Sequence, residues 1–463
     1  MSTPAPQHRP NANASPKMFD VSRRQFIKRC SMIAAMTGLP LWFVERQQLA
    51  AEEIPAAPPT PNNRPGIALI GCGGQGRFDA TNAQKYGDIL AVCDVYDNHA
   101  AAAAKHFTVD GKVPDTYSDF RKVLERPDIH IIINATPDHW HTLVNIAASR
   151  AKKDIYSEKP LTLTIDEGRH VVDTIKANGT VLQTGTQQRS SPRFRLASEL
   201  IRNGRIGTLK DANVWLPAGL RDGPFKSEPV PTGLNWDFWQ GQAPAFDYVK
   251  QRCFTTFRYW YEYSGGTMTD WGAHHNDIAY WAIGLLAPEK VESKALAQPI
   301  PGGYTTFSEY EVNYTYSNGV RLNIKTTKDD SIFGSVVNKD GQRNGIRFEG
   351  TEGWIWVNRD EITASDPHLL TTPLPENAVR LYKSNNHMGN FFDCVRSRAL
   401  PISDVETGHR SATMCHLGAI SLRTGQSLKW DSGAEKFVGW HSHTANGYLK
   451  REMRAPYDYS LVS

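Results

Sequence analysis

Residues 66–76 read Gly-Ile-Ala-Leu-Ile-Gly-Cys-Gly-Gly-Gln-Gly, an apolar strand that runs directly into a glycine-rich turn. Gly71, Gly73 and Gly76 form the pattern G-x-G-x-x-G, and polar, alanine-rich helical sequence follows. Glycines at these positions permit a tight turn and a close approach of the main chain to a pyrophosphate. The N-terminus of the following helix favours the negative charge of that group. The stretch therefore predicts a strand–turn–helix unit that binds a dinucleotide.

The glycine pattern alone is a weak signal, and the next strand strengthens it. Residues 89–93 form a second apolar strand that ends at Asp94, 18 residues after Gly76. A carboxylate at this place accepts hydrogen bonds from both ribose hydroxyls and repels a 2′-phosphate. We therefore expect NAD as the cofactor, with NADP disfavoured by Asp94.

Strands and helices continue to alternate after Asp94. Strands are predicted over 129–134, 154–157 and 181–184, and helices over 140–150 and 166–178. This repetition predicts a parallel, doubly wound sheet, whose ligands lie beyond the carboxyl ends of the strands. The polar residues predicted at these ends are Thr136, His141, Glu158, Lys159 and Gln183.

The composition changes near residue 187, where aromatic residues become dense. Asp270 and His274 follow a Gly-Gly pair at helical i,i+4 spacing, and Asp277 extends the same helical face. A carboxylate beside an imidazole holds its tautomer and raises its basicity, which suits proton abstraction from an alcohol. Taken alone, such a pair is more often structural. The residues best placed before this helix to face a site are Arg258, Tyr259 and Trp260.

Apolar residues alternate with period two over residues 312–316 and 320–324, and Ser317-Asn318-Gly319 between them is a hairpin signal. Residues 339–341 and 351–353 mark further turns. The second half of the chain is therefore predicted to be an α+β domain with a large, mostly antiparallel sheet. The overall fold class is α/β, with a Rossmann sheet in the N-terminal part.

The motifs G-x-G-x-x-G, T-P-x-x-x-H from Thr136, E-K-P from Glu158 and D-x-G-x-H-x-x-D from Asp270 resemble those of the Gfo/Idh/MocA family of oxidoreductases. The resemblance covers roughly residues 65–430. It implies that Lys159, Asp270 and His274 act together in proton transfer to or from a hydroxyl of a sugar, glycoside or polyol. It also implies a homo-oligomer, dimer or tetramer, formed through the C-terminal sheet.

The family's pattern and the strand-end positions together define two predicted sets of site residues. The expected cofactor-binding residues are Gly71, Gly73, Gly74, Gln75, Gly76, Asp94, Thr136, Pro137, His141, Glu158, Lys159 and Gln183. The expected substrate-binding residues are Arg258, Trp260, Asp270, His274 and Asp277. No metal site is predicted, because the histidines are scattered and the six cysteines show no C-x-x-C pairing.

The first 51 residues look like an export leader. Arg23-Arg24 is followed by Phe26 and by a short apolar stretch, Ser31 to Val44, which is too short and interrupted to span a membrane comfortably. A basic region before a short apolar one, with paired arginines, resembles a twin-arginine (Tat) signal. The alternative is a fortuitous arginine pair before a buried helix. We expect export by the Tat machinery to the periplasm, a route that carries folded, cofactor-loaded proteins; Ala50-Ala51 is the nearest cleavage candidate.

The expected domain organisation follows from these segments. After the leader come a proline-rich linker over 52–64, an NAD-binding domain over 65–186 and a substrate domain over 187–430. Residues 431–463 form a tail rich in His, Trp and Tyr with no predicted role. The leader carries seven Lys or Arg and two Asp or Glu, which leaves 45 basic and 46 acidic residues in the remainder. This balance gives no electrostatic support for nucleic-acid binding.

Two other functions stay open at this point. The first is a glycoside hydrolase or lyase that oxidises, eliminates, hydrates and reduces with a tightly bound, recycled NAD; export favours it because free NAD is scarce outside the cytosol. The second is a non-catalytic sugar-binding protein on the same fold, against which the intact glycine, lysine, aspartate and histidine positions argue.

Overall fold

The computed structural model describes residues 23–51, 64–284, 287–326 and 344–463. The chain divides into two compact units, the first of which contains the helices α1 (Arg23–Thr37) and α2 (Leu41–Ala51) of the predicted leader. Within the described ranges, no helix has both the length and the apolar character that crossing a membrane requires. All other helices and strands belong to the second unit except α11, which ends within the first unit's segment 371–373.

The second unit begins with a six-stranded sheet in the order β3-β2-β1-β4-β5-β6, in which every neighbouring pair is parallel. Its strands are β1 (Gly66–Ile70), β2 (Asp88–Cys93), β3 (Asp115–Tyr117), β4 (Ile131–Asn134), β5 (Asp154–Ser157) and β6 (Leu182–Thr184). The central strands β1, β4 and β5 are buried along their whole length, as apolar strands covered on both faces must be. The predicted doubly wound parallel sheet is confirmed.

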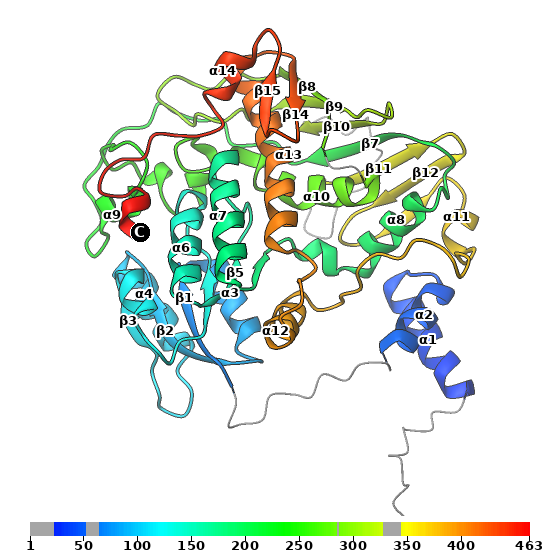
Figure 1. Ribbon diagram of the computed structural model, residues 1–463, viewed down its shortest axis with the longest axis horizontal. Coiled ribbons are helices and arrows are strands. Elements are labelled where there is room, and N and C mark those ends of the chain that lie inside the picture. The colour runs from blue at the N-terminus through cyan, green and yellow to red at the C-terminus, as the bar shows by residue number, and fades with distance from the viewer. Residues whose placement is uncertain (1–22, 52–63, 285–286, 327–343) are drawn as a thin grey trace, which may run out of the picture. The chain divides into compact units, whose positions relative to one another are not determined.

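Helices cover both faces of this sheet (Figure 1). One face packs against α3 (Gly74–Ala83), α4 (Asp97–His106) and α12 (His387–Ser397), whose apolar residues form a single core with alternate residues of β1, β2 and β4. The other face packs against α5, α6 and α7. These last helices span Phe120–Leu124, Asp138–Arg150 and Ile165–Asn178.

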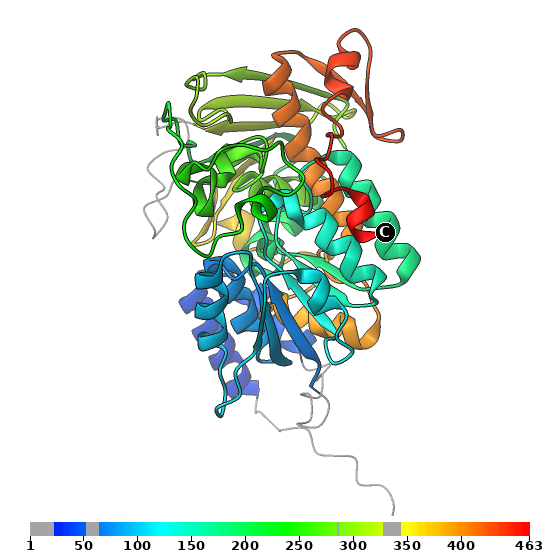
Figure 2. The same cartoon turned by 90° about the vertical axis from the view of Figure 1, so that its left-hand side faces the viewer.

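A nine-stranded sheet follows, in the order β13-β12-β11-β7-β10-β9-β8-β14-β15. Every neighbouring pair is antiparallel except β7 and β10, so the predicted mostly antiparallel sheet is confirmed. In Figure 2 it lies above the parallel sheet. Its strands are β7 (Leu209–Leu216), β8 (Lys290–Ala295), β9 (Tyr310–Thr315), β10 (Arg321–Thr326), β11 (Gly345–Gly350), β12 (Gly353–Val357), β13 (Ile362–Ala364), β14 (Leu428–Asp431) and β15 (Lys436–Val438).

The helices α8 (Pro192–Arg202), α10 (Gly272–Ile283) and α13 (Val405–Thr424) pack against this sheet. Strand β9 shows the resulting alternation, because Tyr310, Val312 and Tyr314 are buried while the residues between them are half-buried. The remaining short elements are α9 (Trp236–Gln240), α11 (His368–Thr371), α14 (Ser442–Asn446) and the 3₁₀ helices η2 (Gln187–Ser190), η3 (Lys250–Arg252), η4 (Phe254–Tyr259), η5 (Gly266–Met268) and η6 (Tyr459–Val462).

Of the three turns predicted for this sheet, two are confirmed and the third lies outside the described residues. Ser317-Asn318-Gly319 joins β9 and β10, and Gly319 has the positive φ of 81° that such a turn needs. The turn at 351–353 joins β11 and β12, as predicted. The turn predicted at 339–341 lies outside the described residues.

The C-terminal tail returns to the parallel sheet. After β15 the chain runs back to the first domain, the part of the second unit that holds the parallel sheet. There Val462 joins the core beside α6, and Tyr457 packs edge-on against Trp140 with 5.9 Å between ring centroids. Arg451 adds an ion pair of 2.7 Å to Glu167 of α7. The tail thus ties the two sheets together, a role that its composition alone did not predict.

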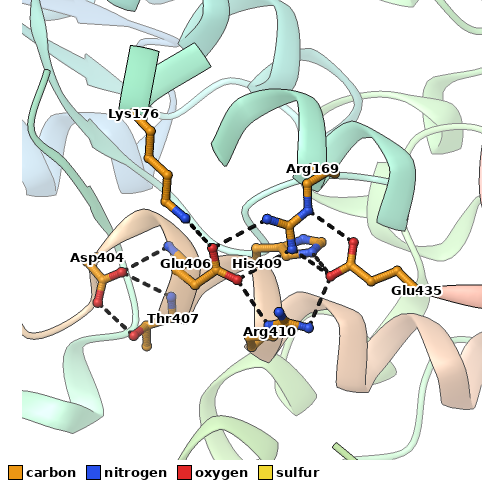
Figure 3. A network of polar contacts seen from close by, with 8 residues as sticks. All are labelled: Arg169, Lys176, Asp404, Glu406, Thr407, His409, Arg410 and Glu435. Carbon is orange, nitrogen blue, oxygen red and sulfur yellow. Dashed lines mark hydrogen bonds and ion pairs between the residues drawn. The ribbon is translucent and has the colours of Figure 1, made fainter. Parts of the chain in front are cut away.

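A network of charged side chains also joins the two domains (Figure 3). Glu406 of α13 accepts a hydrogen bond of 2.8 Å from Lys176 of α7, and Glu435, in the β14–β15 turn, accepts one of 2.6 Å from Arg169. Burial would raise the pKa of both glutamates. The hydrogen bonds from Lys176 and Arg169 to Glu406, and from His409 and Arg169 to Glu435, outweigh it and lower each pKa to about 2.

Acid is therefore expected to weaken this junction. Because the folded-state pKa values lie below the value of about 4.3 for an unfolded glutamate, the network's stabilisation is present above that pH and is lost as the pH falls towards 2. Solvent screening limits the expected loss to about 1 kcal/mol per carboxylate. Urea unfolding of the wild type and of Glu406→Gln at pH 7 and pH 3 checks this. The stability difference between the variant and the wild type should be smaller at pH 3 than at pH 7, because the folded-state pKa of Glu406 of about 2 leaves part of the stabilisation at pH 3. An equal difference at both pH values would contradict the linkage.

Candidate active site

The glycine-rich turn adopts a main-chain path that only glycine permits at two positions. Gly71 has a φ of +89°, and a Cβ atom there would lie 2.4 Å from the Ala135 carbonyl oxygen. A Cβ atom on Gly76 would lie 2.0 Å from the carbonyl oxygen of Gly71. By contrast, a Cβ atom on Gly73 would meet no heavy atom within 4 Å, because this residue faces open space at the start of α3. The turn is thus tight on one side and open to a ligand on the other.

Asp94 links this turn to the end of β2. Its Oδ2 accepts a hydrogen bond of 2.7 Å from the Cys72 main-chain N–H, and its Oδ1 accepts one of 2.9 Å from the Tyr96 N–H. Each carboxylate oxygen can accept a further hydrogen bond, which leaves capacity for ribose hydroxyls. The predicted position of Asp94 at the strand end is confirmed, and its two main-chain contacts hold the carboxylate in place.

A cavity of about 430 Å³ runs along the carboxyl ends of β1, β2, β4 and β5. Eleven of the twelve expected cofactor-binding residues line it: Gly71, Gly73, Gly74, Gln75, Gly76, Asp94, Thr136, Pro137, His141, Glu158 and Lys159. Gln183 does not, since its buried side chain turns away and its Nε2 donates a hydrogen bond of 2.8 Å to the His387 carbonyl. The order of strands brings the others together, as expected for this fold.

The second domain, the part of the chain that holds the nine-stranded sheet, covers this nucleotide cavity. The segment after β7 pairs with the β2–α4 loop, where Asn235 N–H donates to the Val95 carbonyl at 2.9 Å and Asp97 N–H donates to the Gly233 carbonyl at 3.0 Å. Phe254 lies against Tyr96, with 5.7 Å between ring centroids. We call residues 233–258 the cover segment. Several of its residues line the cavity: Leu234, Phe238, Trp239, Phe254, Thr255, Phe257 and Arg258.

A second cavity of about 760 Å³ adjoins the first. Its lining includes Tyr259, Asp270, Trp271, His274 and Arg359. The two cavities share five lining residues: Gln75, Glu158, Lys159, Thr255 and Arg258. Lys159 therefore stands where a nucleotide in the first cavity would meet a substrate in the second.

Lys159 is held at this junction by Asp270. The lysine Nζ hydrogen-bonds to the Asp270 carboxylate, and the Arg258 Nε lies 3.3 Å from the same oxygen. Burial raises the pKa of Asp270, but the Lys159 and Arg258 cations outweigh it and keep the pKa below its usual value. Asp270 is thus an anion that orients Lys159, with the side chain of the lysine only 10% exposed.

His274 differs from its predicted arrangement. Helix α10 begins at Gly272, so Asp270 precedes it, and the Asp270 carboxylate faces Lys159 and Arg258. The His274 Nδ1 has no hydrogen-bond partner among the described residues. Burial, followed by the charges of Lys159 and Arg359, holds the pKa of His274 well below its ordinary value. The imidazole is therefore neutral at pH 7 and can accept a proton or a hydrogen bond in the second cavity.

Two expected substrate-binding residues lie away from both cavities. Asp277 forms a buried, two-pronged ion pair with Arg189, with both N–O distances 2.7 Å. Trp260 is buried under Arg252, whose guanidinium carbon lies 3.8 Å from the ring centroid. Both side chains stabilise the domain, and neither lines the site.

Arg359 and Trp271 line the second cavity but were not selected from the sequence. Arg359, after β12, lies 4.8 Å above the Trp271 ring. Trp271 directly follows Asp270 inside the D-x-G-x-H motif, whereas no local motif marks Arg359.

Comparison with known proteins agrees with this architecture. Residues 66–186 match the model of the Gfo/Idh/MocA oxidoreductase family's NAD-binding Rossmann fold, and residues 217–459 match that of its C-terminal alpha/beta domain. Levoglucosan dehydrogenase of Pseudarthrobacter phenanthrenivorans is 36% identical over 287 residues, which cover 57% of this chain and 64% of that protein. The scyllo-inositol 2-dehydrogenase (NAD(+)) of Bacillus subtilis is 24% identical over 72% of this chain and 87% of its own length.

Solved structures share the fold. A levoglucosan dehydrogenase in complex with NADH and levoglucosan superposes with a TM-score of 0.58 at 20% identity, covering 79% of this chain and 99% of that one. The aldose-aldose oxidoreductase from Caulobacter crescentus complexed with glycerol gives a TM-score of 0.59 at 17% identity, with coverage of 79% and 100%. At these identities the likeness shows the common fold of both domains.

Proposed function

Because the chain belongs to the Gfo/Idh/MocA family of NAD-dependent oxidoreductases, we propose that it transfers hydride between NAD and a hydroxyl-bearing carbon of a sugar, glycoside or polyol. The observation that carries this proposal is the place of Lys159, buried against Asp270 where the nucleotide cavity meets the second cavity. The names of the relatives, which act on levoglucosan and inositols, support the substrate class.

In this proposal each side chain has a distinct role. NAD, when bound, accepts the hydride from the alcohol carbon. The Lys159 ammonium donates a hydrogen bond to the reacting oxygen and stabilises the negative charge that develops there. His274, neutral at pH 7, lines the second cavity and accepts the hydroxyl proton directly or through a bridging water. Asp270 orients Lys159 through their hydrogen bond, and Arg258 contacts the same oxygen of Asp270.

The second cavity offers the polar groups that a polyhydroxylated substrate needs. Its walls carry the amides of Gln75 and Gln187, the Tyr259 hydroxyl and the Arg359 guanidinium, while Trp271 supplies an aromatic surface. Such a mixture of hydrogen-bonding groups and an aromatic ring suits sugar hydroxyls and the apolar faces of sugar rings.

Substrate profiling tests this function. The purified protein with added NAD+ should form NADH with at least one member of a panel of anhydrosugars, inositols, aldoses and glycosides. His274→Ala should bind NAD with unchanged affinity but lose most of that activity. Saturable NAD binding without reduction by any member of the panel would count against a sugar or polyol substrate.

One observation favours a second function, glycoside cleavage with a recycled cofactor. The cover segment closes the nucleotide cavity from the second domain, which suits a nucleotide that stays bound through the catalytic cycle. Nucleotide released by denaturing the purified protein and identified by mass spectrometry separates the two. NAD(H) near one per chain, with cleavage of glycosides without added NAD, supports the recycled cofactor. An empty protein that needs added NAD supports an ordinary dehydrogenase.

We further propose that the chain is exported through the Tat machinery to the periplasm. The support is the Arg23-Arg24 pair ahead of a short apolar stretch in the first unit. A fusion of residues 1–64 to a reporter that functions only after export should be exported in a Tat-competent bacterium. It should stay in the cytosol when both arginines are replaced by lysine or when the Tat translocase is deleted. Export that survives both changes would refute this route.

We also propose a homo-oligomer that assembles through the nine-stranded sheet. The support is the half-buried polar face that β8, β9 and β10 present opposite the residues packed under the helices. Light scattering after size exclusion should give the mass of a dimer or tetramer, and a monomer mass at micromolar concentration would contradict it.

A further inference from the structure

His99 lies next to Asp94, and both residues line the nucleotide cavity. The imidazole Nδ1 is 3.5 Å from the Asp94 Oδ2, the same oxygen that accepts a hydrogen bond of 2.7 Å from the Cys72 main-chain N–H. The side chain of Asp94 is 11% exposed and that of His99 is 34% exposed, so solvent reaches the imidazole. An imidazole that takes up a proton at this distance forms an ion pair with the carboxylate.

Aromatic rings from both domains hold the imidazole in this position. His99 is the third residue of α4, and its main-chain N–H donates a hydrogen bond of 2.9 Å to the Tyr96 carbonyl. Its ring packs edge-on against Tyr96 with 5.0 Å between ring centroids, and against Phe254 of the cover segment with 5.5 Å. The contact between His99 and Asp94 therefore belongs to the packed wall of the nucleotide cavity.

Other charged or titratable side chains lie on the elements around this histidine. Asp94 and Tyr96 follow β2, Asp97 begins α4, and Arg77 lies on α3 and lines the same cavity. The cover segment faces the imidazole with the uncharged ring of Phe254. Among these residue types, histidine is the one whose charge ordinarily changes between pH 5 and 8.

The charge beside Asp94 bears on which dinucleotide the site accepts. An aspartate after the second strand hydrogen-bonds the ribose 2′-hydroxyl of NAD, whereas a nearby cation accommodates the 2′-phosphate of NADP. We propose that His99 determines the selectivity between the two cofactors. As a neutral imidazole it leaves Asp94 to repel NADP, and as an imidazolium it pairs with Asp94 and admits the 2′-phosphate. The selectivity for NAD is then highest above neutral pH and decreases as the pH falls.

This proposal concerns the cofactor and does not depend on which substrate is used. Titration of the whole chain with NAD+ and NADP+ at pH 8 and pH 5.5, followed by protein fluorescence, gives the measured quantity. This quantity is the selectivity, the Kd of NADP+ divided by the Kd of NAD+, and it should be lower at pH 5.5. Part of the decrease belongs to the ligand, because a phosphate monoester takes up a proton near pH 6.

His99→Asn separates the two contributions, because it removes the titrating imidazole and keeps a polar side chain. Its selectivity at pH 8 should match that of the wild type within about threefold, and its decrease on going to pH 5.5 should be about tenfold smaller. His99→Gln should give the same result. His106→Asn is the matched control, since His106 lies on the same helix, is exposed and contacts Thr81 at 3.1 Å instead of the cavity. It should behave as the wild type.

Two outcomes would overturn the proposal. An equal decrease in the wild type and in both His99 variants would show that the imidazole does not determine the selectivity. An effect of His106→Asn as large as that of His99→Asn would assign the pH dependence to the charge of the whole surface. Thermal unfolding of each variant at both pH values confirms that the compared proteins are folded.

Discussion

Lys159→Met is expected to reduce kcat about 10³-fold, because it removes the cation that stabilises the developing charge on the substrate oxygen. Methionine fills similar volume, so the fold should be kept. The loss should appear in kcat, whereas the Kd of NAD+ should change by less than about tenfold, since the glycine turn and Asp94 hold most of the nucleotide. Initial rates and NAD+ titration by protein fluorescence measure both quantities.

Two controls accompany this variant. Lys122 lies on the surface of the same domain in an exposed pair with Glu125 of 2.8 Å, so Lys122→Met should leave kcat unchanged. Lys159→Arg keeps the charge next to Asp270 and should recover part of the activity. Full activity in Lys159→Met would remove Lys159 from the mechanism, and an equal loss in Lys122→Met would point to a general effect on folding.

Gly76→Ala is expected to destabilise the protein and to abolish nucleotide binding. The added methyl group would lie 2.0 Å from the Gly71 carbonyl oxygen, and both residues belong to the same tight turn, so neither can move without distorting its main chain. Relieving this overlap should cost about 2 to 3 kcal/mol of unfolding free energy and displace the turn that receives the pyrophosphate.

Gly73→Ala is the matched control from the same motif. Its methyl group meets nothing within 4 Å, and its φ of −65° suits alanine. The nucleotide-free variant should therefore unfold at the wild-type temperature, while NAD affinity falls about tenfold because the methyl group occupies the pyrophosphate's approach. Thermal unfolding and NAD titration of both variants test the pair. Equal unfolding temperatures for Gly76→Ala and wild type would contradict the steric account.

The parts of the site that sequence reasoning predicted are those encoded locally. An apolar strand ends just before Gly71 to Gly76, before Asp94 and before Glu158-Lys159. The parallel order of the strands brings these ends together independently of the loop sequences. Gln183 was predicted by the same rule, but it lies inside β6, an edge strand, and its side chain turns towards α12 and the chain before α13.

The parts that escaped prediction depend on long-range packing. Asp277 shares a helix with His274, but its carboxylate forms a buried ion pair with Arg189. Helical spacing predicted that the Asp270 carboxylate would contact His274. Helix α10 begins two residues after Asp270, however, and the carboxylate pairs instead with Lys159 and Arg258. The cover segment reaches the β2–α4 loop from the other domain, a contact that no local pattern records.

Hydride transfer from substrate to bound nicotinamide is the central claim, and isotope transfer tests it most directly. The protein is mixed with one equivalent of NAD+ and a sugar or polyol from the active panel that carries deuterium on its hydroxyl-bearing carbons. The nucleotide is then released and analysed by mass spectrometry. For net oxidation, our account predicts deuterium in the NADH formed by the wild type and almost none with Lys159→Met. A recycled cofactor carries the deuterium only while it is reduced, so for that case the samples are quenched during turnover. Turnover of the substrate without deuterium in the reduced nucleotide would contradict the account.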